Sequence, residues 1–480
     1  MLDQELIRLN KLKFLKKKGV LLYPFKTLYI TDNLKNIKKK KIKKKIFVVG
    51  RIFNIIKIGK IFFFIIKDFY SNIQLYIKKK NLKKFSYFLI YNNLLDIGDI
   101  IYVIGKLFIT KKKILTIKVI KIKLLCKSLK VLPQIKINKI GKVFNKFSNV
   151  EKIYRYRYID LIVNNKSKKK FLKRFKISYI IRNFLNKKKF IEVETPILHP
   201  IYGGADAKPF MTYHNKIKNK LYLRIANEIY LKKLIVGGFD KIYEFSKNFR
   251  NEGVDKLHNP EFSMLELYIS YKDYFWMMKF CEKMLYYICK KIYNKNYIKY
   301  GKNIIYFNKP FKKISLYKII DKTLNIINIK KYSLKKLLKL LKKLNIKINK
   351  KKKINKNIIL LKIFEKKCQK KCIQPTYIID YPKSISPFAK IINNTVHRFE
   401  LFINGFEIAN AYTELNDPYE QLCRFKNNNY KNIDYDFINA LKIGMPPTAG
   451  IGIGIDRLCM LFTNSKSIQE IILFPQMKII

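Results

Sequence analysis

The chain has 480 residues, 49% of them hydrophobic, and carries a formal net charge of +71 at pH 7. This length accommodates two or three domains with a large buried core. Residues 1–5 do not resemble a secretory signal, no apolar run approaches the ~20 residues of a membrane span, and the seven cysteines lack the paired spacing of a zinc site. We therefore expect a soluble cytoplasmic protein with reduced thiols and no membrane partner.

The excess of positive charge has two explanations. Lysine-rich surfaces bind nucleic acids by releasing the counterions of the phosphates, but an AT-biased genome also fills tolerant surface positions with lysine, so the charge alone identifies no partner. The acidic residues are more informative. Eleven of the 32 lie in residues 192–273 and five more in residues 400–420. Those two segments are the first places to look for chemistry.

Residues 45–127 contain five short β-rich runs with glycine and polar breaks, plus a helical interlude near residues 80–95. This pattern predicts a small Greek-key barrel of the OB type within an N-terminal domain of residues 1–132. OB barrels bind single-stranded nucleic acids, so Phe63 is a candidate to stack a base and Gln74 a candidate to contact a base edge. Taken alone, Phe63 is explained more simply as a core residue.

Residues 133–150 are predicted to be a linker, and a second domain is expected over residues 151–480. Its pattern predicts a helix over 171–186, a strand over 190–196 that ends at a proline, and a helical stretch over 274–300. Residues 335–356 have the spacing of an amphipathic helix. That helix could bind RNA or a membrane, although a solvated helix enriched in lysine by composition is the simpler interpretation.

Residues 249–268 are typical of a hairpin that carries several functional side chains. On two regular strands, Arg250 and Glu252 would share one face, and so would Phe262, Glu266 and Tyr268. A face of this composition can hold a phosphate, stack a base and bind an ammonium group.

Carboxylates in residues 398–417 could ligate Mg²⁺, which prefers hard oxygen ligands. If residues 407–414 form one regular strand, Asn410 and Glu414 share a face while Glu407 points away, so a metal ligand at 407 and a substrate ligand at 414 would need different sides or a bulge. Farther on, glycines alternate over residues 450–454, and Arg457 follows at an expected helix start suited to polyphosphate. The spacing matches neither a dinucleotide fingerprint nor a P-loop.

Together these segments resemble the class II aminoacyl-tRNA synthetases, and specifically the lysyl-tRNA synthetases. Residues 171–196 resemble motif 1 of that class, residues 243–268 resemble motif 2 and residues 450–462 resemble motif 3. Three further segments resemble the lysine-specific branch, namely residues 203–210, 223–232 and 413–417. The resemblance extends from about residue 45 to the C-terminus and is weakest near residues 325–365. It implies an α+β chain, in which an OB-fold β-barrel precedes a catalytic domain built on an antiparallel sheet flanked by helices.

The resemblance also implies a reaction and its residues. Lysine would be activated by ATP, with several Mg²⁺ ions per active site, and passed to the 3′ end of tRNA(Lys) by a homodimer that forms through motif 1. The implied ATP-binding residues are Arg250, Glu252, His258, Phe262 and Arg457. Three of them, Arg250, Glu252 and Arg457, are also implied to be catalytic. The implied lysine-binding residues are Gly204, Glu228, Glu266, Tyr268, Asn410 and Glu414. The implied metal ligands are Glu400 and Glu407, and the implied anticodon-binding residues are Arg51, Phe63 and Gln74.

Three positions depart from the pattern of that family. Leu257 stands where a basic residue is usual, which puts one phosphate contact in doubt unless Lys256 replaces it. Asn227 stands where proline is usual and is expected to loosen the local turn. Thr413 replaces a serine and retains the hydroxyl.

Two alternative functions deserve comparison. A lysine-activating enzyme with a protein acceptor would lack the barrel, so the predicted barrel favours tRNA. A catalytically decayed RNA-binding protein would be expected to lose site residues, whereas Arg250, Glu252, Glu414 and Arg457 all remain.

Overall fold

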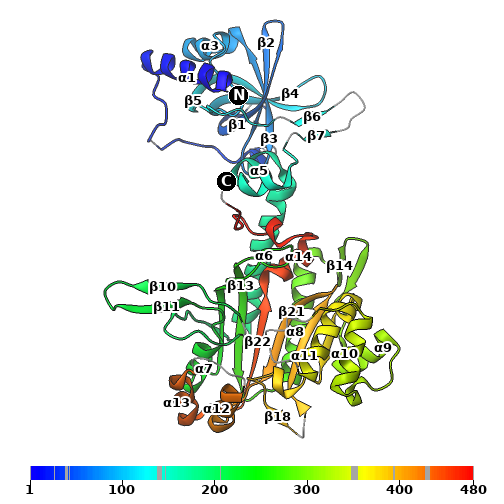
Figure 1. Ribbon diagram of the computed structural model, residues 1–480. Helices are drawn as coiled ribbons and strands as arrows, with labels where there is room; N and C mark the ends of the chain where they lie inside the picture. The colour runs from blue at the N-terminus through cyan, green and yellow to red at the C-terminus, as the bar shows by residue number, and fades with distance from the viewer. Residues whose placement is uncertain are drawn as a thin grey trace. The chain divides into compact units, whose positions relative to one another are not determined.

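The computed structural model describes residues 2–25, 27–37, 42, 44–133, 135–137, 143–145, 147–205, 207–347, 355–392, 395–427 and 433–478. The chain divides into two compact units, Met1–Ser148 and Asn149–Ile480, which Figure 1 colours from blue to cyan and from cyan to red. Among the helices formed by the described residues, none is long and apolar enough to cross a membrane.

The first unit is built on a closed five-stranded barrel with strand order β1-β2-β3-β5-β4. Neighbouring strands pair antiparallel except β3 and β5, which run parallel. Burial alternates strictly along β2, so Phe62, Phe64 and Ile66 fill the barrel core. The barrel predicted from the sequence is confirmed. The strands are β1 (Lys45–Ile58), β2 (Ile61–Lys67), β3 (Asn72–Lys78), β4 (Ile100–Ile109) and β5 (Leu115–Cys126), and the helices of the unit are α1 (Leu2–Lys17), α2 (Leu34–Ile37) and α3 (Lys84–Tyr91).

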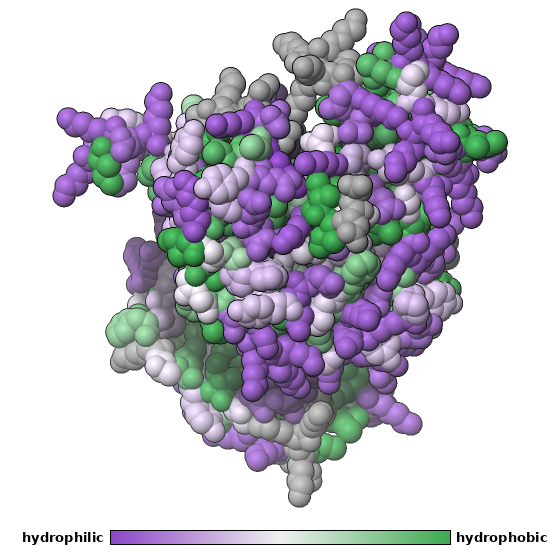
Figure 2. Space-filling model, turned by 90° about the horizontal axis from the view of Figure 1, so that it is seen from below, coloured by the Kyte–Doolittle hydropathy of each residue, from purple (hydrophilic) through white to green (hydrophobic). Residues whose placement is uncertain are grey.

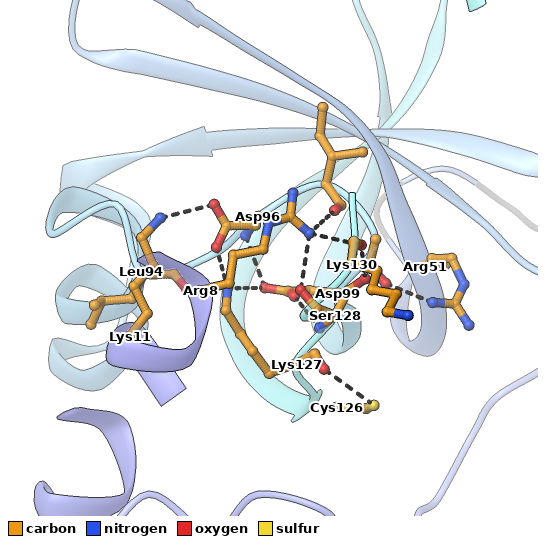
Figure 3. A network of polar contacts seen from close by, with 12 residues as sticks. Arg8, Lys11, Arg51, Leu94, Asp96, Asp99, Cys126, Lys127, Ser128 and Lys130 are labelled. Carbon is orange, nitrogen blue, oxygen red and sulfur yellow. Dashed lines mark hydrogen bonds and ion pairs between the residues drawn. The ribbon is translucent and has the colours of Figure 1, made fainter. Parts of the chain in front are cut away.

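A network of charged side chains joins helix α1 to the barrel (Figure 3). Arg8 donates hydrogen bonds to three backbone carbonyls, and Lys11 forms an ion pair with Asp96 at 2.8 Å. Lys127, fully buried, pairs with both Asp96 and Asp99. Because buried charges are tolerated only when they are paired, this network makes helix α1 part of the barrel unit.

The described part of the expected linker contains two short paired strands, β6 (Ile135–Ile137) and β7 (Val143–Asn145). The linker therefore has secondary structure that the sequence pattern did not predict. Its residues 134, 138–142 and 146 lie outside the described residues.

The second unit is built on an eight-stranded sheet with strand order β16-β17-β20-β21-β22-β13-β12-β8. Pairing is antiparallel except at the two edges, where β16 runs parallel to β17 and β8 runs parallel to β12. The predicted class of an antiparallel sheet flanked by helices is confirmed. The strands are β8 (Ile191–Glu192), β12 (Lys241–Phe249), β13 (Glu261–Ser270), β16 (Lys312–Ser315), β17 (Thr376–Ile379), β20 (Arg398–Ile403), β21 (Phe406–Thr413) and β22 (Thr448–Gly454).

Helices and small sheets surround this central sheet (Figure 1). The helices are α4 (Val150–Arg155), α5 (Arg157–Val163), α6 (Asn165–Lys187), α7 (Glu228–Val236), α8 (Tyr274–Tyr293), α9 (Leu316–Leu324), α10 (Leu334–Lys343), α11 (Lys356–Ile363), α12 (Pro418–Asn427), α13 (Tyr435–Gly444) and α14 (Ile455–Thr463). The remaining strands are β9 (Leu198–His199), β10 (Met211–His214), β11 (Asn219–Leu223), β14 (Tyr297–Tyr300), β15 (Asn303–Tyr306), β18 (Ile391–Ile392) and β19 (Thr395–Val396).

The two faces of the central sheet have different roles. Successive side chains of a strand point to opposite faces. On β13, Leu265 and Leu267 join a large apolar core with residues of α6, α8 and α14. The intervening Glu266 and Tyr268 point to the other face, where they line a cavity. Helices α6, α8 and α14 thus cover one face, whereas α7 packs on part of the other face beside Tyr268 and the cavity lies there as well.

Four predicted elements have different bounds in the structure, among them the helix expected over 171–186, which runs from Asn165 to Lys187. The strand expected over 190–196 is only two residues long, and the helix expected over 274–300 ends at Tyr293. Asn294 caps that helix in the left-handed region, with φ of 55°. The amphipathic helix expected over 335–356 ends at Lys343, shortly before Asn345 with φ of 54°. Residues 348–354 lie outside the described residues.

Hydrophilic residues predominate on the face shown in Figure 2, and apolar residues occur there in small separate groups. Hydrophilic residues are thus spread over this face and do not gather in one patch.

Candidate active site

A cavity of about 1300 Å³ opens on the face of the central sheet that carries Glu266 and Tyr268. It is lined by strands β13, β21 and β22, by the N-terminus of α7 and by the loop between β12 and β13. Every site residue predicted in the second unit lines this cavity except Glu400. Residues far apart in the chain, such as Gly204 and Gly454, therefore meet in one place.

Glycines form part of the cavity wall because the strands pass close to functional side chains. A Cβ atom at Gly450 would lie 2.2 Å from Glu414 Oε1 and 2.5 Å from the Tyr268 ring. No side chain fits in that space, so β22 can lie against these two residues only with glycine at 450. Gly204 has a similar requirement, since its φ of +84° favours glycine.

Arg250 and Glu252 lie in the loop that follows β12. Strand β12 ends at Phe249, Arg250 N donates to Pro260 O, and Glu252 N donates to Arg250 O. The expectation that they share one strand face is therefore wrong, because the hairpin pairing stops before them. Both nevertheless line the cavity.

Arg250 is a half-buried cation that forms no ion pair with a carboxylate among the described residues. Its guanidinium lies 5.0 Å from the centroid of the Phe262 ring, and its Nε atom has no hydrogen-bond partner among the described residues. Burial lowers the pKa of Arg250, although Glu407 and Glu252 counteract that effect. Buried Arg224, in contrast, pairs with Glu244 at 2.8 Å. A half-buried guanidinium that lines a cavity and forms no ion pair indicates a site for an anion.

Arg457 connects helix α14 to the loop between β12 and β13. Its Nη2 lies 3.0 Å from His258 Nε2, and its Nη1 donates to Glu407 O at 3.1 Å. His258 Nδ1 in turn lies 2.9 Å from Asp255. Neighbouring Leu257 packs against an apolar cluster that includes Met460. The leucine thus anchors the loop by packing, and a compensating role of the adjacent lysine stays a prediction.

A bulge decides how the two predicted metal ligands are placed. Leu401 pairs with Ala409 whereas Phe402 pairs with Glu407, so β21 has one extra residue between these pairs. The shift turns Glu407 to the face that carries Glu400 and Asn410. The bulge therefore resolves the conflict that one regular strand would have created.

Glu400 does not line the cavity and is already bonded within the protein. Arg398 Nη2 donates to its Oε1 at 2.5 Å, and Tyr381 Oη donates to its Oε2 at 2.8 Å. Burial raises the pKa of Glu400 to about 7, with Arg398 opposing and Glu407 adding to the effect. Among the described residues there is no group of three or more side chains suited to hold a metal ion. A cation at this pair would need further ligands from a substrate.

The opposite part of the cavity is rich in buried carboxylates. Burial raises the pKa of Glu266 to about 8, with Glu228 and Glu244 adding to it. Burial likewise raises the pKa of Glu414 to about 8, although Lys232 opposes this shift. Glu414 Oε1 has no hydrogen-bond partner among the described residues. Unsatisfied buried oxygen of this kind indicates a site for a cationic ligand.

The structure adds functional residues that the sequence analysis missed. Lys232 lies 2.6 Å from both Glu228 and Glu414, with no exposed side-chain surface. Its position four residues after Glu228 on a helix was the available signal, because such residues are neighbours on one face. Arg398, which also donates to Asn410 Oδ1 at 3.3 Å, could not be assigned from the sequence.

The two other departures from the family pattern are accommodated. Asn227 is fully buried, donates to Glu244 at 2.8 Å and accepts from Ser246. These bonds tie the residue before α7 to strand β12, and the expected loosening of the turn stays a prediction. Thr413 Oγ1 accepts a hydrogen bond from Tyr274 N at 3.0 Å.

The three residues predicted to bind an anticodon lie on the outer face of the barrel. Phe63 and Gln74 are half-buried and point away from the core, as does Arg51, which donates to Gly98 O at 2.7 Å (Figure 3). A core position for Phe63 is therefore wrong. Tyr76 lies beside Phe63, with ring centroids 5.7 Å apart, and was not predicted.

Comparisons with known proteins agree with this geometry. Residues 149–478 match the family described as tRNA synthetases class II (D, K and N), and residues 46–132 match the OB-fold nucleic acid binding domain. The chain is 45% identical over all of its length, and 99% of the relative's length, to "Lysine--tRNA ligase" of Azobacteroides pseudotrichonymphae genomovar. CFP2. It is 47% identical to the protein with the same description in Buchnera aphidicola subsp. Cinara cedri (strain Cc), with 99% of this chain and 97% of the relative covered.

Proposed function

Because this chain belongs to the class II tRNA synthetases (D, K and N), we propose that it activates L-lysine with ATP to lysyl-adenylate and pyrophosphate and transfers lysine to the 3′ end of tRNA(Lys). The family inferred from the sequence motifs is confirmed. The observation that carries the lysine proposal is the cavity itself, which holds a half-buried cation, Arg250, and a buried carboxylate, Glu414, whose Oε1 has no hydrogen-bond partner among the described residues. A zwitterion with an additional ammonium group satisfies both.

We assign a place in this cavity to each reacting group. We assign Arg250 to the substrate carboxylate and the α-phosphate, where charge accumulates as the carboxylate attacks. Phe262 is assigned to stacking on the adenine, with Glu252 and His258 as further ATP contacts, and Arg457 to the terminal phosphate. No side-chain nucleophile is needed, because the substrate carboxylate attacks directly and the protein contributes positioning and electrostatics.

The amino-acid end is assigned to the carboxylate-rich part of the cavity. Glu414 and Tyr268 would bind the ε-ammonium, with Glu266 beside them, while Glu228, Gly204 and Asn410 would hold the α-amino group. A buried carboxylate that faces the ε-ammonium rejects neutral analogues, which would leave its charge unpaired.

We also propose that Glu400 and Glu407 hold Mg²⁺ together with the ATP phosphates. The bulge places both on one face, and Glu407 remains accessible from the cavity. Such a cation would neutralise charge on the phosphates. With two protein carboxylates only, most of its ligands would come from ATP and water, which suits Mg²⁺.

Lysine-dependent exchange of pyrophosphate into ATP tests the proposed function directly. Purified protein should catalyse exchange with lysine and should not with aspartate or asparagine. Exchange stimulated by aspartate or asparagine would mean that lysine is not the amino acid that this site selects. An absence of exchange with intact tRNA binding would instead support a decayed enzyme that only binds RNA.

The acceptor is assigned to tRNA because the second matched domain is an OB-fold. A lysine-activating enzyme with a protein acceptor does not require a barrel whose outer face carries aromatic and basic side chains. Replacing Phe63 by alanine should raise the KM for tRNA about tenfold, the effect of losing one stacked base, and leave pyrophosphate exchange unchanged.

The matched control is Phe85→Ala, which removes an exposed ring from helix α3. Aminoacylation kinetics with tRNA(Lys) transcripts provide the measurement. Equal effects of the two variants would contradict the anticodon role of Phe63.

We further propose a homodimer that forms through helix α6, in the cytoplasm where tRNA is charged. Leu172, Phe175 and Tyr179 are 43%, 51% and 65% exposed and share one face of that helix. Phe175→Glu should shift the mass in light scattering from dimer to monomer, since a charge cannot be buried there unpaired. Ile327→Glu, at a 90% exposed position outside the helix, should leave the mass unchanged. A monomeric unmodified protein would contradict the proposal.

A further inference from the structure

Lys232 occupies an unusual position behind the wall of the cavity. Its side chain has no exposed surface, and its Nζ lies 2.6 Å from Glu228 Oε1 and 2.6 Å from Glu414 Oε2. Both carboxylates line the cavity, whereas Lys232 is not among the lining residues that the structure describes. The ammonium of Lys232 therefore contacts the two carboxylates from the side away from the ligand.

This arrangement leaves one oxygen of each carboxylate for the cavity. Glu414 Oε1 faces β22 and has no hydrogen-bond partner among the described residues, and Glu228 Oε2 lies toward Gly204. The two oxygens on Lys232 cannot be farther apart than twice 2.6 Å, because both contact the same nitrogen atom. Lys232 thus determines the separation of two carboxylates that come from α7 and from the end of β21.

The position of Lys232 is itself well determined. Its Nζ lies 4.5 Å from the centroid of the Phe388 ring, and helix α7 packs through Ile229 and Ile235 into an apolar cluster. Burial alone would lower the pKa of Lys232, but Glu228 and Glu414 outweigh burial and raise it, so this cation stays charged. A fixed charge on a packed helix provides a rigid reference point.

The charges of the site also require Lys232. Three buried carboxylates, Glu228, Glu266 and Glu414, surround the amino-acid end of the cavity. When a bound lysine has displaced their protons, its two ammonium groups compensate two of these carboxylates and Lys232 compensates the third, while Arg250 is left for the substrate carboxylate. Without Lys232, one buried negative charge would remain uncompensated.

We propose that Lys232 is a positioning residue for amino-acid selection, which joins Glu228 to Glu414 and so matches the spacing of these carboxylates to the two ammonium groups of lysine. This inference rests on the proposed function. It predicts that discrimination against ornithine, in which the two ammonium groups are one methylene closer, depends on a residue that never touches the substrate.

The test compares lysine and ornithine in pyrophosphate exchange. Lys232→Met removes the charge and keeps the length of the side chain. It should raise the KM for lysine about 100-fold, the usual effect of leaving a buried charge unpaired, and leave the KM for ATP unchanged. The preference for lysine over ornithine in kcat/KM should fall about tenfold. The reason is that Glu228 and Glu414, no longer held at one separation, would accept ammonium groups that are one methylene closer.

The neighbouring residue provides a matched control. Lys233 lies on the same helix but pairs with Asp436 outside the cavity, so Lys233→Met should retain the preference for lysine. Lys232→Arg keeps the charge and alters its geometry, and it should recover part of the lost activity while the preference for lysine remains reduced. If Lys232→Met does not fold, as judged by circular dichroism, the preference of Lys232→Arg for lysine over ornithine alone tests the positioning role.

Three results can be distinguished. An unchanged preference for lysine in folded Lys232→Met or Lys232→Arg would overturn the positioning role while leaving the proposed function intact. A lower KM for lysine in Lys232→Met would overturn it as well, because Lys232 would then compete with the substrate ammonium. An absence of lysine-dependent exchange in the unmodified protein would overturn the proposed function itself.

Discussion

Arg250→Gln should lower the kcat of pyrophosphate exchange about 1000-fold, a magnitude typical for the loss of a group that stabilises developing negative charge. The half-buried guanidinium forms no ion pair with a carboxylate among the residues that the structure describes, so its charge is available to the reacting carboxylate and phosphate. Glutamine keeps hydrogen-bonding capacity but removes the charge. Pre-steady-state measurement of adenylate formation would assign the loss to the chemical step.

Lys247→Gln is the matched control for this prediction. Lys247 lies on the same hairpin, where it pairs with Glu261 near the surface, and it does not line the cavity. Its replacement removes one positive charge from the hairpin and should leave kcat unchanged. A similar decrease in both variants would show that net charge matters and would contradict the specific role of Arg250.

Glu414→Gln should raise the KM for lysine about 100-fold, because truncating one partner of a buried charge pair has effects of that size. The KM for ATP should change little, since the phosphates lie toward Arg457. Glu420→Gln, which alters a carboxylate paired with Arg424 and Lys383 outside the cavity, provides the control. Equal losses of lysine and ATP binding in Glu414→Gln would contradict its assignment to the ε-ammonium.

The raised pKa values of Glu414 and Glu266 predict that lysine binding depends on pH. Burial raises the pKa of Glu266 and of Glu414 to about 8, so the empty cavity holds protons that a bound ammonium must displace. The KM for lysine should therefore fall as the pH rises toward 8, and the dependence should weaken in Glu414→Gln. The groups that face Glu414 in this titration are Lys232, Glu228, Tyr268 and Tyr412.

Local patterns were sufficient to predict much of the architecture. Alternation of apolar side chains marked the strands of the barrel, because a half-buried strand requires a period of two. The motifs around Arg250, Glu414 and Arg457 identified most of the cavity residues from their types and order. Helix ends were predicted less well, since Asn294 and Asn345 end helices through a backbone conformation that periodicity does not reveal.

The relations between distant segments were decided by the tertiary structure. The amino-acid sequence by itself determined which residue types the site contains and which strands carry them. Folding decided that Glu407 turns to the side of Glu400 through a bulge, that Arg398 and Tyr381 bind Glu400, and that Lys232 joins Glu228 to Glu414. The physical reason is that periodicity depends on the backbone of one segment, whereas register, bulges and buried ion pairs depend on contacts between segments that are far apart in the chain.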